Sequence, residues 1–289
     1  MRNHVRLNLS ATLASVAVAA TLVLMKLWAL AETRALSVGA SLVDNGLDLM
    51  VSLGGLAAVA YAARPPDEDH AFGHTSAEDL AALGQSVFIL VSAALLAVAS
   101  ILRLLADEAA PIASEAQGIA AMTASIILTG ALVLFQRRVA ARTGSRVVRA
   151  DSMHYLGDLV PNVGAIVSLW ASAAFGLTEI DSLVALAAAG ILVLGAVRIF
   201  GGAWGALMDR AAEPRMIAAI EALARDHPGV LGFHDLKTRT AGSRVFVNLH
   251  LELDGAQTLT EAHAIGAALK SKIVEAYPET DVIIHKDPR

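Results

Sequence analysis

The chain has 289 residues, of which 56% are hydrophobic and only 17% are charged. Soluble domains carry more charge and fewer apolar residues, so this composition indicates a protein that lies largely in a membrane. The net charge of −5, with no basic patch interleaved with aromatics, argues against nucleic-acid binding, and the lack of cysteine excludes disulfides and leaves histidine and carboxylates as metal ligands.

Six apolar segments approach or exceed the roughly 20 residues that a helix needs to cross a bilayer. From Asp209 onward the composition is that of an ordinary soluble domain. The sequence therefore predicts an α-helical membrane domain over residues 1–208 and a soluble domain over residues 209–289. The expected transmembrane helices lie near residues 9–31, 36–62, 80–106, 116–136, 152–175 and 181–205.

Basic residues gather at the N-terminus and in the connections that follow the second and fourth segments. This distribution predicts that both termini are cytoplasmic in a multi-pass protein of the cell (inner) membrane. A cleaved signal peptide is the competing interpretation of the first segment, but the apolar run is long and Lys26 interrupts its end. Lys26 and Arg198 are single charges near segment ends, where a long side chain can reach the interface.

Segment 36–62 contains two acidic residues, Asp44 and Asp48. Their spacing of four residues places both on one face of a helix. A charge at bilayer depth costs at least roughly 2.5–3.5 kcal/mol, so such residues usually serve a function. We expect this face to point into the helix bundle or a water-filled cavity.

The connection after this segment reads RPPDEDHAFGHTSAED. Asp67, His70 and His74 are three and four residues apart, so one short turn can bring them together on an ion. Glu68 and Asp69 are alternative carboxylates. The competing interpretation is a solvated polar loop that caps the next helix.

Segment 152–175 repeats the membrane pattern with His154 and Asp158. Segments two and five run in opposite directions, so the two pairs can meet near the middle of the membrane. Three carboxylates and one imidazole suit a divalent metal, and four ligands match the tetrahedral preference of zinc. Hydrogen bonding between helices is the competing role. Pro161, further along the segment, is either a functional bend or a tolerated membrane proline.

The soluble domain is expected to follow the order helix, strand, strand, helix, strand (αββαβ), which fits a small ferredoxin-like α+β fold. Pro214 opens the first helix. Residues 245–253 alternate between apolar and polar, as in a half-buried strand, and Val282-Ile283-Ile284 forms the last strand. Thr258 and Glu261 have the spacing of a capping box that starts the second helix.

Potential metal ligands recur along this domain. One histidine is usually a surface residue, but four histidines and a carboxylate within about 55 residues indicate metal binding. His4 and His227 fall outside every candidate cluster. The ligands predicted here are His234, His250, His263, His285 and Asp287.

With these residues in view, the chain resembles the cation diffusion facilitator family, in its zinc/iron efflux branch, along nearly the whole length. The resemblance rests on SLVDNGLD, DEDHAFGH and ADSMHYLGD in the first domain. It also rests on FHDLKTR, VNLHLE, EAHAIG and VIIHKDP in the second. Together these motifs are specific, whereas each alone is weak.

The resemblance implies a homodimer in the lipid bilayer that exports divalent metal from the cytoplasm in exchange for protons. It implies a transport site, a loop site and a two-metal site in the cytoplasmic domain that strengthens the dimer. These sites correspond to Asp44, Asp48, His154 and Asp158; to Asp67, His70 and His74; and to His234, His250, His263, His285 and Asp287.

Two positions depart from the pattern of this branch. Ser76 stands where a lysine typically pairs across the dimer with an aspartate that Asp209 matches here, and Gly157 precedes Asp158 where serine or threonine is common. The charge pair across the dimer is therefore not expected here, and Gly157 is expected to loosen the surroundings of the transport site.

The ligand types favour Zn²⁺ or Cd²⁺ over Mn²⁺, and Fe²⁺ stays open because availability often overrides affinity. An enzyme is not expected, because the chain has no H-E-x-x-H, G-x-S-x-G or phosphate-cradling glycine loop. The alternative function is a membrane metal sensor or scaffold that binds metal without transporting it. A passive channel is disfavoured, because four strong ligands would hold an ion too tightly for fast conduction.

Overall fold

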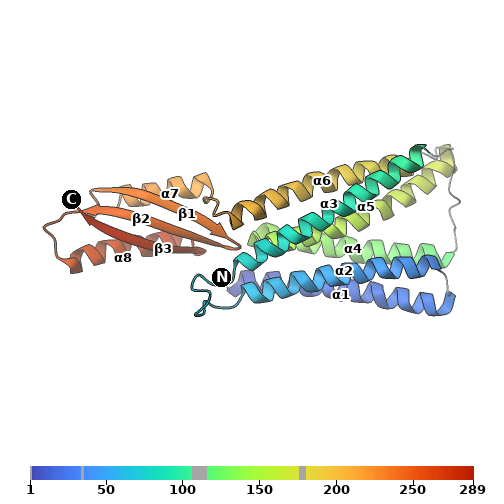
Figure 1. The fold of residues 1–289 in the computed structure, drawn as a ribbon, viewed down its shortest axis with the longest axis horizontal. Coiled ribbons are helices and arrows are strands. Elements are labelled where there is room, and N and C mark those ends of the chain that lie inside the picture. The colour runs from blue at the N-terminus through green and yellow to red at the C-terminus, as the bar shows by residue number, and fades with distance from the viewer. Residues whose placement is uncertain (1, 34–35, 106–115, 176–179) are drawn as a thin grey trace. The chain divides into compact units, whose positions relative to one another are not determined.

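The computed structural model describes residues 2–33, 36–105, 116–175 and 180–289, which form six long helices followed by a small α+β unit (Figure 1). The chain divides into two compact units, which comprise Arg2–Ala203 and Trp204–Arg289. The helical membrane domain and the C-terminal α+β domain are as predicted. The exact boundary at residue 208 stays a prediction.

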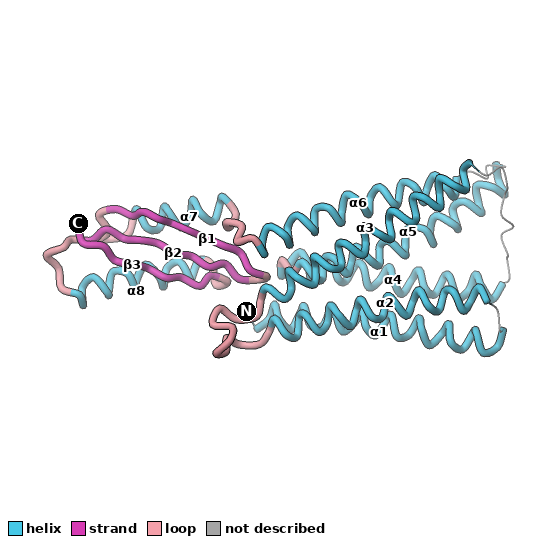
Figure 2. The backbone as a smooth tube through the Cα atoms, in the orientation of Figure 1, coloured by secondary structure: helices cyan, strands magenta, loops and turns pink. Residues whose placement is uncertain are grey.

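The first unit is a bundle of long helices that run side by side (Figures 1 and 2). Among the described residues, four helices are long and apolar enough to cross a membrane: His4–Trp28, Asn45–Ala62, Ser76–Leu102 and Ser182–Leu207. The count of six crossings therefore stays a prediction. The helices are α1 (Arg2–Thr33), α2 (Leu36–Ala62), α3 (Ser76–Leu105), α4 (Ala116–Thr143), α5 (Arg146–Phe175) and α6 (Ile180–Leu207).

Small side chains let these helices approach closely. Ala82 on α3, Ala150 on α5 and Ala203 on α6 are fully buried in one cluster, while large residues such as Leu95 and Leu102 are exposed on the outside of α3. Small residues at the contacts and large apolar residues outside are typical of membrane helices. Gly144, with φ +71°, makes the tight turn between α4 and α5, a conformation that side chains with a Cβ rarely adopt.

The second unit has two layers, with a three-stranded sheet on one side and two helices on the other. Strand β2 (Arg244–Leu253) lies in the centre, antiparallel to β1 (Gly232–Ala241) and parallel to β3 (Thr280–Pro288). Helices α7 (Pro214–Arg225) and α8 (Leu259–Ala276) contact each other and share one apolar core with the sheet. The predicted αββαβ order is confirmed.

Side chains along β2 alternate between the apolar core and the opposite, polar face of the sheet. Val247, Leu249 and Leu251 are buried under the helices, whereas Asn248 and His250 point to the opposite face. The predicted capping box is present at the start of α8, where the Thr258 hydroxyl accepts a hydrogen bond from the Glu261 backbone N–H and the Glu261 carboxylate accepts one from the Thr258 backbone N–H.

Candidate metal centres

Asp48 on α2 meets His154 and Asp158 on α5 inside the helix bundle. His154 Nε2 lies 3.1 Å from Asp48 Oδ1, and one ligand atom from each of the three residues lies within 4.8 Å of the other two. Asp48 and His154 are buried, at 8% and 6% exposure. We call these three residues the α2–α5 cluster. Its ligands come from two helices that the sequence predicted would meet.

The electrostatics of the α2–α5 cluster favour a cation. Two carboxylates at this separation repel each other by about 3–4 kcal/mol at an effective dielectric constant of about 20. A divalent ion or bound protons remove this repulsion. The rings of Phe88 on α3 and Tyr155 contact the His154 imidazole, with centroids 5.5 and 5.4 Å away.

The connection between α2 and α3 folds into a second group, the loop cluster of Asp67, His70 and His74. His74 Nε2 and His70 Nδ1 each lie 3.2 Å from a different oxygen of the Asp67 carboxylate. The His70 backbone N–H donates to the same carboxylate over 2.7 Å and lowers the pKa of the Asp67 side chain. His74 is buried at 4% exposure, and its Nδ1 has no hydrogen-bond partner among the described atoms.

The third group, the sheet cluster, lies across all three strands of the second unit. His234, His250 and His285 occupy paired positions on β1, β2 and β3, so their rings stack in a row 5.0 and 4.7 Å apart. Asp287 lies within 3.2, 2.9 and 3.0 Å of the three imidazoles in turn. The contact with His250 is the largest cause of a lowered pKa for the Asp287 carboxyl.

A β-bulge helps to build the sheet cluster. The register of β1 against β2 shifts between His234 and Lys237, and Asp235 within the shift has φ +50°. A bulge bends its strand and redirects the neighbouring side chains. His234 is the last residue paired before the shift, so the bulge lies beside a candidate ligand.

Not every predicted ligand joins these groups. The side chain of Asp44, one turn before Asp48 on α2, lies outside the described residues, as does that of Pro161. Glu68 and Asp69 are exposed and take no part in the loop cluster. His263 is exposed on α8. It lies in the helical layer, whereas the sheet cluster occupies the opposite face of the sheet, so within one chain the two are separated.

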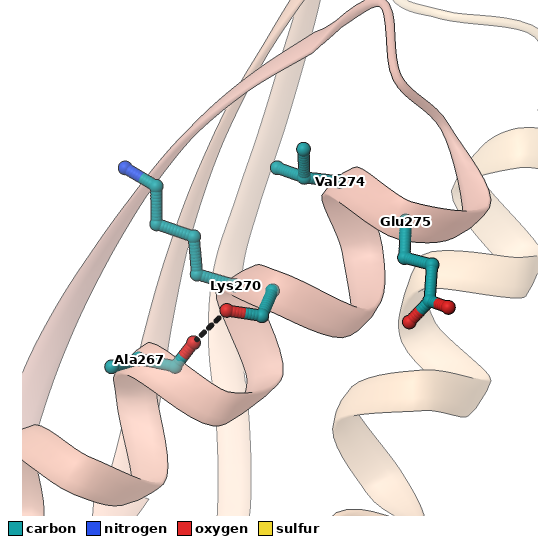
Figure 3. A pocket seen from close by; sticks show the side chains of 5 residues that line it. Ala267, Lys270, Val274 and Glu275 are labelled. Carbon is teal, nitrogen blue, oxygen red and sulfur yellow. Dashed lines mark hydrogen bonds between the residues drawn. The ribbon is translucent and has the colours of Figure 1, made fainter.

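A shallow hollow along α8 contains no predicted ligand (Figure 3). Lys270 and Glu275 carry opposite charges at its edges, and the Ser271 hydroxyl donates to the Ala267 carbonyl oxygen over 3.0 Å within the same helix. This hollow has no arrangement of groups for holding a metal.

Comparison with known proteins now decides the family. The model described as the cation efflux transmembrane domain matches residues 12–208, and the model for the cation efflux protein cytoplasmic domain matches residues 212–289. The chain belongs to the cation diffusion facilitator family. This cation efflux protein therefore exports divalent metal across a membrane and is not an enzyme, as the motifs predicted.

Two cation-efflux pumps align with nearly the whole chain. The cation-efflux pump FieF of Cronobacter sakazakii is 40% identical over 283 residues, which is 98% of this chain and 93% of that protein. FieF of Shewanella oneidensis is 41% identical over 278 residues, covering 96% and 93%. The metal-bound C-terminal domain of the CzcD transporter from Thermotoga maritima covers 26% of this chain and 87% of its own length, with 25% identity and a TM-score of 0.25.

Both departures lie among the described residues of this cation efflux protein. A Cβ at Gly157 would lie 3.3 Å from the side chain of Leu192, so the glycine lets α5 approach α6 closely. Asp209 pairs with Arg239 of β1 over 3.1 Å, within its own unit. Ser76 is the exposed first residue of α3.

Polar residues outside the predicted sites also gather in the bundle. Lys26 does not simply reach the interface, because its ammonium group donates to Asn45 Oδ1 on α2 over 2.7 Å. Arg146 pairs with Asp79 between α5 and α3. Ser15 and Gln136 both contact Asp151. Their uncharged polar character was the only sequence signal for Ser15 and Gln136.

Replacing Asp287 by asparagine is expected to weaken Zn²⁺ binding at the sheet cluster by at least roughly 10- to 100-fold, the loss seen on removing even an outer partner of a metal ligand. A lowered pKa keeps the wild-type Asp287 carboxylate ionised as the pH falls through the ordinary carboxyl range. The carboxylate therefore stays available as a metal ligand in that range, and the asparagine variant removes its charge at every pH.

Calorimetric Zn²⁺ titration of the full chain between about pH 5 and 8 measures this prediction. The background carries Asp48→Ala and Asp67→Ala, so that the other two clusters do not contribute. Asp281→Asn is the control, because Asp281 lies on the same strand outside the cluster. Equal affinity in the Asp287→Asn variant and the control would contradict the assignment.

Proposed function

We propose that this protein exports Zn²⁺ from the cytoplasm in exchange for protons, and that Asp44, Asp48, His154 and Asp158 form the transport site. The observation that carries the proposal is the convergence of Asp48, His154 and Asp158 from two helices, inside the part of the chain that matches the cation efflux transmembrane domain. One imidazole and carboxylate oxygens are ligands that Zn²⁺ accepts in tetrahedral geometry. Asp44, one turn from Asp48, supplies the fourth ligand.

Proton exchange follows from the same ligands. Zn²⁺ binds only when His154 is neutral and the carboxylates are ionised, so binding and protonation exclude each other. When the site opens to a more acidic outside, protons displace Zn²⁺. When it opens to the cytoplasm, the protons leave and Zn²⁺ binds again. The buried repulsion between Asp48 and Asp158 makes an empty, unprotonated site unfavourable, so either the metal or protons occupy it at each step.

The two other clusters are proposed to act from the cytoplasmic side. Basic residues at the end of α4 and the start of α5, together with Arg64 after α2, support cytoplasmic termini. Asp67, His70 and His74 form a loop site, and His234, His250, His285 and Asp287 form a site that tunes activity and strengthens a homodimer. His263 is a further candidate ligand for the cytoplasmic domain. Cd²⁺ and Fe²⁺ are the other substrates that fit these ligand types.

Replacing His154 by aspartate tests the assignment of substrate to site. A set of four carboxylates is harder than the natural set, so the variant is expected to shift its preference from Zn²⁺ towards Mn²⁺ by about tenfold or more, equal to about 1.4 kcal/mol. Competition uptake of the two metals into proteoliposomes with a pH gradient measures the shift. His4→Asp, at an exposed histidine near the N-terminus, is the matched control. An unchanged preference in the His154→Asp variant would remove His154 from the transport site.

A further inference from the structure

A network of buried polar side chains joins α5 to three neighbouring helices beside the α2–α5 cluster. Its members are almost completely buried: Ser15 and Gln136 at 0% exposure and Ser52, Asp151 and Tyr155 at 1%. Asp151 and Tyr155 are four residues apart, so they lie on one face of α5. None of the five is a predicted metal ligand.

The Tyr155 hydroxyl connects α5 to α1 and α2. It lies 2.8 Å from the Ser52 hydroxyl on α2, and it donates to the Ser15 backbone carbonyl on α1 over 3.2 Å. The tyrosine ring packs against Leu132 and Val133 of α4. The ring therefore has apolar support that does not depend on the hydroxyl.

The Asp151 carboxylate connects α5 to α1 and α4. One of its oxygens accepts hydrogen bonds from the Ser15 hydroxyl and, over 2.6 Å, from the Gln136 side-chain amide. The same amide lies 2.6 Å from the Ser15 hydroxyl. Hydrogen bonds in a membrane interior are costly to break, because no water replaces the lost partner.

The network lies next to the proposed ligands on both helices. Tyr155 directly follows His154 on α5, and Ser52 is one turn beyond Asp48 on α2. A rotation of α5 that aims the Tyr155 hydroxyl at Ser52 therefore also turns the His154 imidazole towards Asp48. Loss of the hydrogen bonds of the Tyr155 hydroxyl allows α5 to rotate or slide while the Tyr155 ring stays packed against α4.

We propose that Tyr155, Ser52 and Asp151 are positioning residues that set the rotation of α5 and so bring His154 within reach of the ion at Asp48. This role rests on the transport site proposed above. Through the position of His154, these three residues outside the ligand set influence metal affinity. Removal of the Tyr155 hydroxyl is expected to lower the Zn²⁺ affinity of the transport site more than it lowers the free energy of unfolding.

Transport kinetics of the Tyr155→Phe, Ser52→Ala and double variants test the proposal. Initial Zn²⁺ uptake into proteoliposomes, measured against Zn²⁺ concentration, should give kcat/KM lowered roughly 10- to 100-fold in each single variant, mainly through a higher KM. The double variant should be no worse than the more affected single variant, because both changes remove the same hydrogen bond. A purely structural role would instead lower the yield of folded protein and leave KM unchanged.

Ser86→Ala is the matched control, because Ser86 is also fully buried but its hydroxyl donates to the Leu83 carbonyl oxygen in its own helix. It should keep the wild-type KM. Asp151→Asn retains an oxygen that can accept from Ser15 and Gln136 and should stay near wild type, whereas Asp151→Leu should behave like Tyr155→Phe. A wild-type KM in Tyr155→Phe, or an equal loss in Ser86→Ala, would overturn the positioning role.

Asp48→Ala in the same assay separates this inference from the proposed transport site. If Asp48→Ala stops uptake while Tyr155→Phe has a wild-type KM, the site stands and the positioning role fails. If Asp48→Ala transports normally, the site itself is wrong, and the positioning role fails with it.

Discussion

Replacing Asp48 by alanine is expected to abolish Zn²⁺ transport driven by a pH gradient, with a loss greater than the roughly 10- to 100-fold seen when only an outer partner of a ligand is removed. Asp48 is the ligand that α2 places against α5, with Oδ1 lying 3.1 Å from His154 Nε2. Without it, the described ligands left at the site are both on α5. Only the proposed ligand Asp44 would then connect the ion to α2, and three ligands no longer complete the tetrahedral set.

The same substitution should remove proton exchange together with metal transport. Asp48 and Asp158 are close enough to repel when both are ionised, and in the proposed mechanism this repulsion makes the site alternate between metal and protons. The alanine variant removes that repulsion and one exchangeable proton. Asp158→Ala should give the same double loss, since it removes the other carboxylate of the described pair.

Zn²⁺ flux and internal pH, recorded together in proteoliposomes, measure both losses. Asp69→Ala is the control, because Asp69 is an exposed loop aspartate outside every described cluster. Full Zn²⁺ flux in the Asp48→Ala variant would show that the ion takes another route. Zn²⁺ flux without proton movement in wild type would contradict the exchange mechanism but leave the metal site intact.

The candidate sites were predictable from sequence because their residues are anomalous where they occur. Asp48 and His154 are ionisable residues in segments that otherwise suit a bilayer, so their energetic cost alone marks them. His234, His250 and His285 were predictable as a set, but their pairing across three strands depends on strand register. The alternation along β2 placed His250 on the polar side, and the register brings the other two histidines beside it.

The supporting contacts were not predictable for a different physical reason. Ser15 and Gln136 are uncharged, so their presence in an apolar helix costs little and excludes few arrangements. Ser15 lies 136 positions before its partner Asp151, and Gln136 lies 15 positions before it on a different helix. Nothing in local spacing relates α1 to α5. The same holds for Asp79 and Arg146, which are 67 residues apart.

Replacing Arg146 by methionine is expected to destabilise the helical unit by about 3–5 kcal/mol, the cost of removing one member of a buried ion pair. Arg146 Nη1 lies 2.5 Å from Asp79 Oδ1, and the Asp79 side chain is completely buried while that of Arg146 is 25% exposed. The neighbouring residues form a parallel contact, because the Ser145 hydroxyl donates to Glu78 over 3.0 Å. The start of α5 is thus tied to the first turn of α3, close behind His74 of the loop cluster.

The unequal burial of the pair predicts unequal effects. Asp79→Asn should cost less than Arg146→Met, because the partly exposed guanidinium group can turn towards water, whereas the Asp79 carboxylate cannot. Asp79→Leu combined with Arg146→Met should recover much of the stability, since an apolar pair leaves no buried charge. Unfolding of the detergent-solubilised chain by heat or denaturant measures each free energy. Arg149→Met is the control, because Arg149 is exposed on the same turn of α5. If Arg149→Met lowers the free energy of unfolding as much as Arg146→Met does, the effect comes from removing a positive charge and not from the ion pair.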